Sequence, residues 1–441
     1  MPKTVLVVGG GAFGLSAALS LQKRGYQATV FDRLPIPAVD AASTDISKVI
    51  RPDYATQTLY QTLALDAIDA FKTKWNPDAQ MRFGSPLYTE CGSLFATRSP
   101  TMTDFEQQSI ETLQKDPRAR VERVGKDVIA ASMGSAFANE FPYGYVNHSA
   151  GFADSGLTMR YLAEIAGEAG VKFVVGKEKG AFLELIEEGG KVVGIVTVDG
   201  VKHFGDMVLM AAGAWTSSLL PALQGLCTVS AQPVIHFKLP DTLKAKFEHG
   251  KFPVWFADVS NTGFYGFPVS AAGELKIANH GPGFVSSFHN DTKPASVASK
   301  SRGSIETPTA IPKESVKMYR KFLAKAFPEL NKLDISRTRL CWYCESWDGN
   351  FYIDAVPEKK NLFVATGGSG HGFKFVPVLG DVIADIVEGK NTPFRKLFKW
   401  RPREVEVVDA IRQKTTLKPK VLEQVAMASN VDLAARIDSL L

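Results

Sequence analysis

The stretch Val7-Val8-Gly9-Gly10-Gly11-Ala12-Phe13-Gly14 stands near the start of the chain, between an apolar run and a helical pattern. Residues 4–8 are rich in valine and predict a buried parallel strand. Apolar residues recur at near-helical spacing after Gly14, and Gly25 predicts the end of that helix. Residues 27–31 predict a second strand, so this segment has the order of a βαβ unit in an α/β fold.

Three glycines of this stretch occupy the positions that a dinucleotide-binding turn requires. Gly9 permits the tight turn, Gly11 lets backbone amides approach a pyrophosphate, and Gly14 permits close packing of the helix on the strand. The helix N-terminus would stabilise the phosphate charge. Asp32 ends the second strand and would accept hydrogen bonds from a ribose diol. The motif predicts a dinucleotide without separating NAD from FAD, and the acidic residue disfavours NADP.

Composition limits the class of protein. The 441 residues are 45% hydrophobic, so two joined domains with large cores are expected. The 51 basic and 46 acidic residues are spread along the chain, and the formal charge of +5 gives no nucleic-acid footprint. No apolar run reaches about 18 residues, so no membrane span is expected.

The expected location is intracellular, either cytoplasmic or peroxisomal. Four cysteines are too few for a disulfide framework, which indicates a reducing compartment. The first residues run directly into structured sequence, so no secretory leader is expected. Ser439-Leu440-Leu441 resembles a peroxisomal tripeptide only loosely, because its middle position is not basic, and chance similarity is the preferred interpretation.

A second glycine loop follows a predicted strand at residues 362–366. It reads Gly367-Gly-Ser369-Gly370-His371-Gly372-Phe373-Lys374 and leads into a predicted helix. Structural turn glycines are the competing interpretation of this loop, but Lys374 in the first helical turn opposes the helix dipole, so something other than helix stability should account for it. In a flavoprotein the natural target of this helix N-terminus is the N1/O2 edge of the ring.

The run Cys341-Trp-Tyr343-Cys344 has the spacing of a redox dithiol or of half a zinc site. Cys91 and Cys227 stand alone, and no histidine cluster is near in sequence, so no metal is expected. Beside a flavin-type glycine loop, the Cys341 thiol suggests where a redox cofactor is tethered.

Together these segments resemble the monomeric sarcosine oxidase group of FAD-dependent amine oxidases, which includes pipecolate, saccharopine and fructosyl amino acid oxidases. The resemblance covers nearly the whole chain. Besides the first glycine loop, it is carried by Asp45-Ile-Ser-Lys48-Val-Ile-Arg51, Ala211-Ala-Gly213-Ala-Trp215, Tyr265-Gly-Phe-Pro268, Lys276-Ile-Ala-Asn-His280, Cys341-Trp-Tyr343 and Ser369-Gly-His371-Gly-Phe-Lys374.

The resemblance implies the D-amino acid oxidase/sarcosine oxidase type of fold. A Rossmann-like FAD-binding domain, expected over residues 1–85, 146–226 and 330–441, is interleaved with an antiparallel-sheet substrate domain, expected over residues 86–145 and 227–329. Residues 227–282 agree with this, because they carry aromatic-rich strands. Residues 286–312 predict a long surface excursion, and the tail from residue 418 has a helical pattern.

FAD is the implied cofactor, and the resemblance implies a thioether from Cys341 to its 8α carbon. Cys344 has no counterpart in that role and is interpreted as an ordinary buried thiol. The expected cofactor contacts are Gly9, Gly11, Ala12, Phe13, Gly14, Asp32, Arg33, Ser43, Lys48, Ala212, Gly213, Trp215, Cys341, Gly370, Gly372, Phe373 and Lys374.

Carried over by position, Arg51 and Lys374 resemble the pair that holds a substrate carboxylate. Lys276 resembles the lysine that stabilises superoxide forming from O2. Taken alone, each of these cations could also be an ordinary surface residue. Tyr265 and His280 resemble polar groups on the substrate side, and the competing interpretation is a sheet tyrosine and a satisfied core histidine.

Departures from the pattern bear on the substrate. Lys48 stands where bacterial sarcosine oxidases have arginine and where fructosyl oxidases carry lysine. His280 and Arg51 instead depart from the fructosyl pattern, which has glutamate at the first position and lacks the arginine. The favoured substrate therefore has an α-carboxylate beside a secondary amine, as in an N-methyl amino acid, a cyclic imino acid such as pipecolate, or saccharopine, rather than a glycated amino acid.

The expected reaction oxidises the C–N bond to an imine and reduces O2 to H2O2, in a monomer without nucleic-acid or membrane partners. Three alternatives remain open. The first is a fructosyl amino acid oxidase, and the second is a flavin- or NAD-binding module that has lost catalysis. The third is an NAD-linked dehydrogenase, which would leave Cys341 unexplained.

Overall fold

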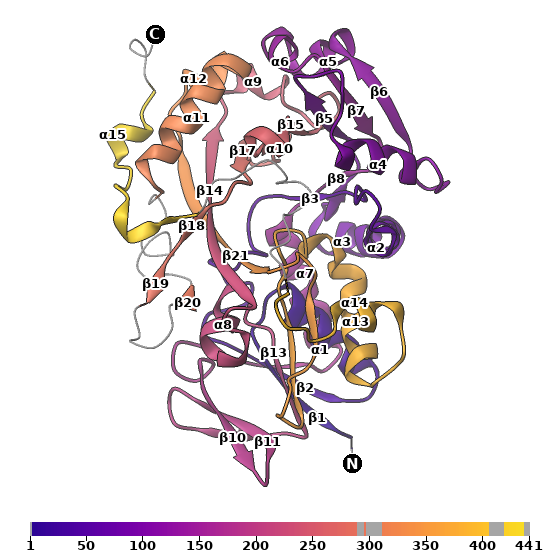
Figure 1. Ribbon diagram of the computed structural model, residues 1–441, viewed down its shortest axis with the longest axis vertical. Coiled ribbons are helices and arrows are strands. Elements are labelled where there is room, and N and C mark those ends of the chain that lie inside the picture. Colours follow the sequence, from indigo (N-terminus) through magenta and orange to yellow (C-terminus); the bar gives the residue numbers. More distant parts are fainter. Residues whose placement is uncertain (1, 289–294, 297–310, 405–418, 436–441) are drawn as a thin grey trace.

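The computed structural model describes residues 2–288, 295–296, 311–404 and 419–435. A six-stranded sheet, in the order β22-β23-β13-β1-β2-β9, forms the lower part of the molecule in Figure 1. All neighbouring pairs in it are parallel except β22 with β23. Its strands are β1 (Thr4–Val8), β2 (Gln27–Asp32), β9 (Lys172–Val175), β13 (Met207–Met210), β22 (Tyr352–Ala355) and β23 (Leu362–Thr366).

Both faces of this sheet are covered, which explains the unbroken apolar run of β1. Val5 and Val7 pack into one core with the helices α1 (Ala12–Lys23), α7 (Ser155–Glu168) and α13 (Val376–Val387). Leu6 and Val8 face the opposite core, which contains Val192 and Ile195 of a three-stranded sheet. That sheet, β10 (Phe182–Glu188), β11 (Lys191–Thr197) and β12 (Lys202–Phe204), is antiparallel.

A ten-stranded sheet fills much of the upper part, and the long strand β14 runs from it toward the parallel sheet (Figure 1). β21 pairs with β14 in antiparallel fashion over ten residue pairs. The strands are β5 (Ser93–Thr97), β6 (Val121–Gly125), β7 (Tyr143–Asn147), β14 (Cys227–Lys238), β15 (Val254–Ala257), β16 (Phe264–Gly266), β17 (Glu274–Asn279), β18 (Phe284–Val285), β21 (Arg337–Ser346) and β24 (Lys420–Val421).

A small sheet of β3 (Lys48–Ile50), β8 (Gly151–Ala153) and β4 (Tyr88–Thr89) carries the start of the Lys48-to-Arg51 segment. The remaining helices surround the sheets. They are α2 (Thr58–Ala70), η1 (Phe71–Trp75), α3 (Asn76–Phe83), α4 (Asp104–Leu113), α5 (Lys126–Met133), α6 (Ser135–Glu140), η2 (Gly213–Trp215), α8 (Thr216–Leu219), η3 (Pro221–Leu223), α9 (Asp241–Lys244), α10 (Val259–Thr262), α11 (Lys313–Ala326), α12 (Pro328–Asn331), η4 (Phe373–Phe375) and α14 (Pro393–Phe398).

The expected α/β class with an added antiparallel sheet is confirmed. The division into domains stays a prediction, and β21 bears on it. This strand falls within residues 330–441, assigned by sequence to the FAD-binding domain, yet it pairs along β14 of the large sheet. None of the helices in the described ranges is long and apolar enough to cross a membrane.

One local prediction is wrong. The tail was expected to be helical from residue 418, but residues 419–435 contain β24, η5 (Leu422–Gln424) and the short α15 (Asn430–Leu433). β24 pairs with β18, while Leu422 and Leu433 are buried in the core beside α11, so tertiary packing overrides the helical spacing. Most of the expected excursion at residues 286–312 lies outside the described residues, which there include β19 (Ser287–Phe288) and β20 (Ala295–Ser296).

Candidate active site

A cavity of about 1320 Å³ runs beside the carboxyl ends of β1 and β2 and reaches the large sheet. Both glycine loops contribute to its wall. Of the residues expected at the site, the cavity is lined by Gly9, Gly11, Ala12, Phe13, Asp32, Arg33, Ser43, Lys48, Arg51, Ala212, Gly213, Trp215, Tyr265, His280, Gly370, Gly372, Phe373 and Lys374. Gly14, Lys276 and Cys341 lie behind this wall.

The first glycine loop is shaped for close approach of a phosphate. A Cβ added at Gly14 would lie 1.9 Å from the Gly9 carbonyl oxygen, so helix α1 can pack this tightly only with glycine. A Cβ at Gly11 would meet only the Ser43 hydroxyl, at 3.7 Å, so this backbone faces open space. Gly11 is also the N-cap of α1 and provides no side-chain cap, which leaves helix amides for an anion.

Asp32 sits at the end of β2 on the cavity wall. Its carboxylate accepts hydrogen bonds from the amides of Gly10, at 2.8 Å, and Leu34, at 3.0 Å. Burial raises the pKa of Asp32, although these two hydrogen bonds oppose the shift. The loop and this fixed carboxylate fit the pyrophosphate and ribose of a dinucleotide, and the cavity exceeds the usual range of about 300–1,000 Å³ for ligand sites.

Arg51 is 5% exposed and lies in an aromatic box. Its guanidinium carbon is 5.4–5.8 Å from the ring centres of Tyr54, Phe95, Phe105 and Phe256. The neighbouring carboxylate of Asp53 accepts hydrogen bonds from Tyr145 and Asn147 instead, at 2.8 and 3.0 Å. Within the described residues Arg51 forms no ion pair and hydrogen-bonds the main-chain oxygen of Asp53.

Lys374 faces the same cavity and is 4% exposed. Its Nζ donates hydrogen bonds to the Tyr54 hydroxyl, at 2.9 Å, and to the main-chain oxygen of His371, at 3.0 Å. Burial and the charge of Arg51 hold the pKa of Lys374 well below its usual range. Lys374 lies in η4, just before α13 begins, so this lysine both lines the cavity and stands near a helix N-terminus, where the helix dipole disfavours a positive charge.

A second charged group lies behind the wall. Lys276 Nζ is 2.7 Å from Asp45 Oδ2 and donates to the Ser47 main-chain oxygen at 2.6 Å. Burial lowers the pKa of Lys276 to about 8, although the Asp45 carboxylate opposes the shift. Asp45 also contacts Lys48 Nζ at 3.9 Å and His236 Nε2 at 3.3 Å.

Cys341 joins this group through Lys48, whose Nζ lies 3.8 Å from its sulfur atom. The Cys341 side chain is 1% exposed and packs with Val234, Ala278 and Tyr343. Tyr343 in turn lines the cavity and lies 6.0 Å, ring centre to ring centre, from His280. Tyr265 lies on the same wall, where it stacks on Phe256.

Cys344 is buried, as expected, but it also lines the cavity. The Thr366 hydroxyl lies 3.4 Å from its sulfur. A hydrogen bond with the Cys227 thiol, opposed by burial, lowers the pKa of Cys344 to about 7.

Several residues of the site were missed by sequence reasoning. Asp45 and Tyr54 stand three residues from Lys48 and from Arg51, so their places in these motifs were available signals. His236, Phe105 and Phe256 come from distant parts of the chain and gave no local signal.

Comparisons with known proteins identify the family of the chain. A family model described as FAD dependent oxidoreductase (DAO) matches residues 4–386. L-saccharopine oxidase of Schizosaccharomyces pombe is 30% identical over 419 residues, which cover 91% of this chain and 94% of that protein. N-methyl-L-tryptophan oxidase of Salmonella dublin is 27% identical over 406 residues, covering 90% and 98%.

The crystal structure of fructosamine oxidase (Amadoriase II) from Aspergillus fumigatus superimposes with a TM-score of 0.80 at 26% identity, covering 97% of each chain. The family match includes both glycine loops and the segments that carry Arg51, Lys276 and Cys341. The chain therefore belongs to the FAD dependent oxidoreductase family and is an FAD-dependent enzyme.

Proposed function

We propose that the enzyme is an oxidase of a secondary-amine amino acid, such as an N-methyl amino acid, a cyclic imino acid or saccharopine. The observation that carries this proposal is the pair Arg51 and Lys374. Two buried cations line one cavity, and the buried carboxylate of Asp53 is the one negative charge that acts on both within the described residues. Asp53 accepts hydrogen bonds from Tyr145 and Asn147, and one carboxylate cannot balance two cations. Buried charges ordinarily have partners, so a ligand carboxylate is the expected counter-charge.

The two cations would fix the substrate by its α-carboxylate. A guanidinium offers a bidentate pair of hydrogen bonds, and the ammonium adds a third. Phe105 and Phe256 beside Arg51 exclude water, which strengthens this attraction. A carboxylate held in this way sets the position of the neighbouring carbon and amine, with Tyr265 and His280 on the same cavity wall.

The amine reacts without its extra proton, and the substrate loses a hydride equivalent from Cα or the N-alkyl carbon to become an imine. Water then hydrolyses the imine. FAD supplies the two-electron redox chemistry and returns the electrons to O2, which gives H2O2.

For Lys276 we propose the role of a fixed positive charge that stabilises superoxide as it forms from O2. Supporting this, Asp45 is shared between the ammonium groups of Lys276 and Lys48, so the cluster retains positive charge. For Cys341 we propose the thioether to FAD. Its support is the position of the thiol directly behind the cavity wall, next to Lys48 and Tyr343.

A fructosyl amino acid oxidase is the second candidate. It is favoured by Lys48 and by the likeness to fructosamine oxidase at 26% identity, and opposed by Arg51 and His280. Membership of the FAD dependent oxidoreductase family excludes the third alternative, an NAD-linked dehydrogenase. The retained cations Arg51, Lys276 and Lys374 argue against a module without catalysis. A monomer in the cytoplasm or the peroxisome remains our prediction.

A peroxide assay over a panel of amines tests the proposal. Sarcosine, N-methyl-tryptophan, pipecolate and saccharopine would be compared with fructosyl-valine and fructosyl-lysine at equal concentration. We expect peroxide with at least one of the secondary amino acids. Turnover of the fructosyl compounds alone would establish the second candidate instead, and turnover of no amine would support the module without catalysis.

A further inference from the structure

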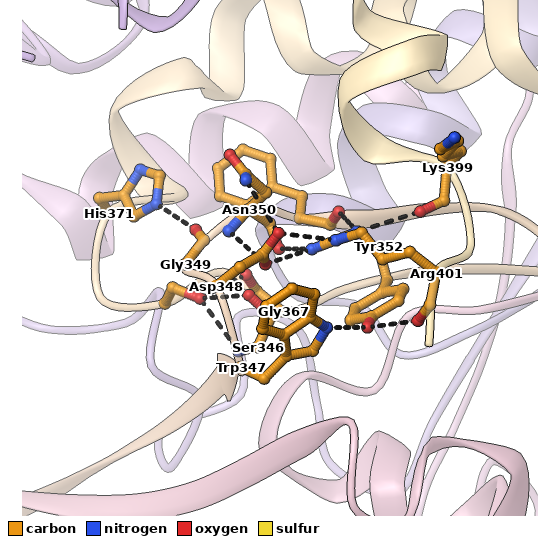
Figure 2. Close-up of polar contacts among 12 residues, drawn as sticks. Ser346, Trp347, Asp348, Gly349, Asn350, Tyr352, Gly367, His371, Lys399 and Arg401 are labelled. Atoms are coloured by element: carbon orange, nitrogen blue, oxygen red, sulfur yellow. Dashed lines mark hydrogen bonds and ion pairs between the residues drawn. The ribbon is translucent and has the colours of Figure 1, made fainter. Parts of the chain in front are cut away.

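A chain of hydrogen bonds connects Lys374 to the loop that follows β21. Lys374 Nζ is 2.9 Å from the Tyr54 hydroxyl oxygen, and this hydroxyl is 3.0 Å from His371 Nδ1. On the other side of the imidazole ring, His371 Nε2 is 3.0 Å from the Gly349 main-chain oxygen. Figure 2 shows this last contact at one edge of a larger polar network.

Each hydrogen bond in this chain has a defined direction. The Gly349 oxygen can only accept, so Nε2 carries a proton, and Nδ1 is an acceptor when the ring is neutral. The Tyr54 hydroxyl therefore donates to His371, and its oxygen accepts from Lys374. Lys374 also donates to the main-chain oxygen of His371 at 3.0 Å. An ammonium group has three N–H donors, so two are directed by this arrangement and one remains for a ligand.

The far end of the chain is anchored. Figure 2 shows Arg401 against the loop, where its guanidinium makes two hydrogen bonds of 2.8 and 2.5 Å to the Asp348 carboxylate. The same guanidinium donates to the Asn350 main-chain oxygen at 2.8 Å. The His371 ring is held as well, because it stacks on Phe351 with 4.9 Å between ring centres. Gly349 therefore helps to fix the His371 ring, and His371 presents a fixed partner to Tyr54.

We propose that Tyr54 and His371 are positioning residues, which hold the Lys374 ammonium group in the orientation that binds a carboxylate. The role of Lys374 in binding a carboxylate rests on the proposed function. A lysine side chain has four rotatable bonds, so an isolated ammonium group would not keep one direction. The Tyr54 hydroxyl and the His371 main-chain oxygen accept two N–H groups of the Lys374 ammonium, which leaves the third N–H for the cavity.

The test measures binding of acetate to the FAD-loaded protein through the change in flavin absorbance, with acetamide as the uncharged probe. Tyr54→Phe and His371→Phe each remove one link. Because hydrogen bonds to charged groups contribute about 1.5–3 kcal/mol, we expect the acetate Kd to rise roughly 10- to 100-fold. The acetamide Kd should stay within about threefold.

Three further variants separate positioning from general packing. His371→Asn retains an acceptor near the place of Nδ1 and should recover most of the acetate affinity. The double variant of Tyr54→Phe and His371→Phe should bind acetate no more weakly than Tyr54→Phe, because His371 acts through Tyr54. Tyr60→Phe is the matched control, since Tyr60 stacks on Tyr54 but takes no part in the chain, and it should bind acetate like the parent protein.

The pH dependence gives an independent readout. Acetate binding requires the ammonium form of Lys374, which burial and Arg51 disfavour and Asp53 favours, so it is lost as the pH rises through the pKa of this lysine. Arg51 and Asp53 are unchanged in the variants, so their effect is common to all of them. Removing the Tyr54 acceptor destabilises the charged form and lowers that pKa further, so the loss in Tyr54→Phe should move to lower pH. If Tyr54 were needed only for folding, Tyr54→Phe would lower the affinity for both acetate and acetamide, and the pH at which acetate binding is lost would not change.

Unchanged acetate affinity in Tyr54→Phe would overturn the positioning role, and so would equal losses of acetate and acetamide binding. Additive losses in the double variant would also overturn it. Failure of the proposed function has a different signature. In that case no amine would yield peroxide, while acetate binding would still depend on Lys374, Tyr54 and His371.

Discussion

Lys276 and Asp45 form a buried ion pair, with 2.7 Å between Nζ and Oδ2 and side chains that are 1% and 0% exposed. Lys48 Nζ lies 3.9 Å from the same carboxylate. One carboxylate between two ammonium groups leaves positive charge behind the cavity wall, close to Cys341. The cluster of Lys276, Asp45 and Lys48 therefore carries a net positive charge, which the Lys276–Asp45 pair alone would not.

Replacing Lys276 by Met should slow reoxidation of the reduced flavin by O2 by roughly 10²–10³-fold, because a preorganised charge is lost from a water-excluded site. Reduction of the flavin by the amine should change by only a few-fold. Stopped-flow measurement of the two half-reactions checks this. Slower reduction with unaltered reoxidation would remove the proposed role of Lys276.

Reoxidation should also depend on pH. The pKa of Lys276 is lowered from 10.5 to about 8, so the group is charged below pH 8 and loses its proton as the pH rises through that value. We expect the rate constant for reoxidation to fall above about pH 8. In Lys276→Arg the decline should disappear from the range below pH 10, because a guanidinium keeps its proton. A flat profile in the parent enzyme contradicts this prediction.

Cys341→Ser should leave FAD extractable by acid, whereas the parent protein should retain its flavin after precipitation. The matched control is Cys344→Ser, which removes the other thiol of the same strand and should keep the flavin bound. Release of flavin from the parent protein would exclude the thioether. Release only from Cys344→Ser would assign the attachment to that residue.

Arg51→Met and Lys374→Met should each raise KM for the amino acid by about 10²-fold, since a charge-assisted contact contributes roughly 2–3 kcal/mol. An amine of the same shape without a carboxylate should be affected far less. Steady-state kinetics with both compounds provide the check. Equal effects on the two compounds would show that these cations do not bind the carboxylate.

Two alanine substitutions in the first glycine loop should behave differently. In Gly14→Ala the new Cβ would lie 1.9 Å from the Gly9 oxygen, so we expect destabilisation of several kcal/mol, measurable by urea unfolding. In Gly11→Ala the Cβ has space in the apoprotein, at 3.7 Å from its neighbour, so the fold should persist while FAD affinity falls. Equal stability of the two variants would contradict this account of the loop.

The sequence was most informative where local pattern and tertiary structure agree. The apolar runs on either side of the glycine loop predicted β1 and β2, because buried strands of a parallel sheet carry such runs. The spacing of Gly9, Gly11 and Gly14 predicted the turn and the close packing of α1. The tail was mispredicted because pairing of β24 with β18 is a long-range contact that helical spacing cannot reveal.

The same limit applies to the site. Arg51 and Lys374 could be named from their motifs, but the aromatic box around Arg51 joins α4, β5 and β15 and is set by sheet topology. His236 contacts Asp45, which is 191 positions away in the sequence, and His371 contacts Tyr54, which is 317 positions away. Such partners are fixed by packing, so no local spacing identified them.

Anaerobic mixing of the purified enzyme with secondary amino acids tests the central claim most directly. The predicted result is that sarcosine, N-methyl-tryptophan, pipecolate or saccharopine bleaches the flavin absorbance band at about 450 nm. In Arg51→Met the same bleaching should require a higher concentration of the amino acid. A flavin that stays oxidised with every secondary amino acid, or a purified protein without flavin, would contradict the account.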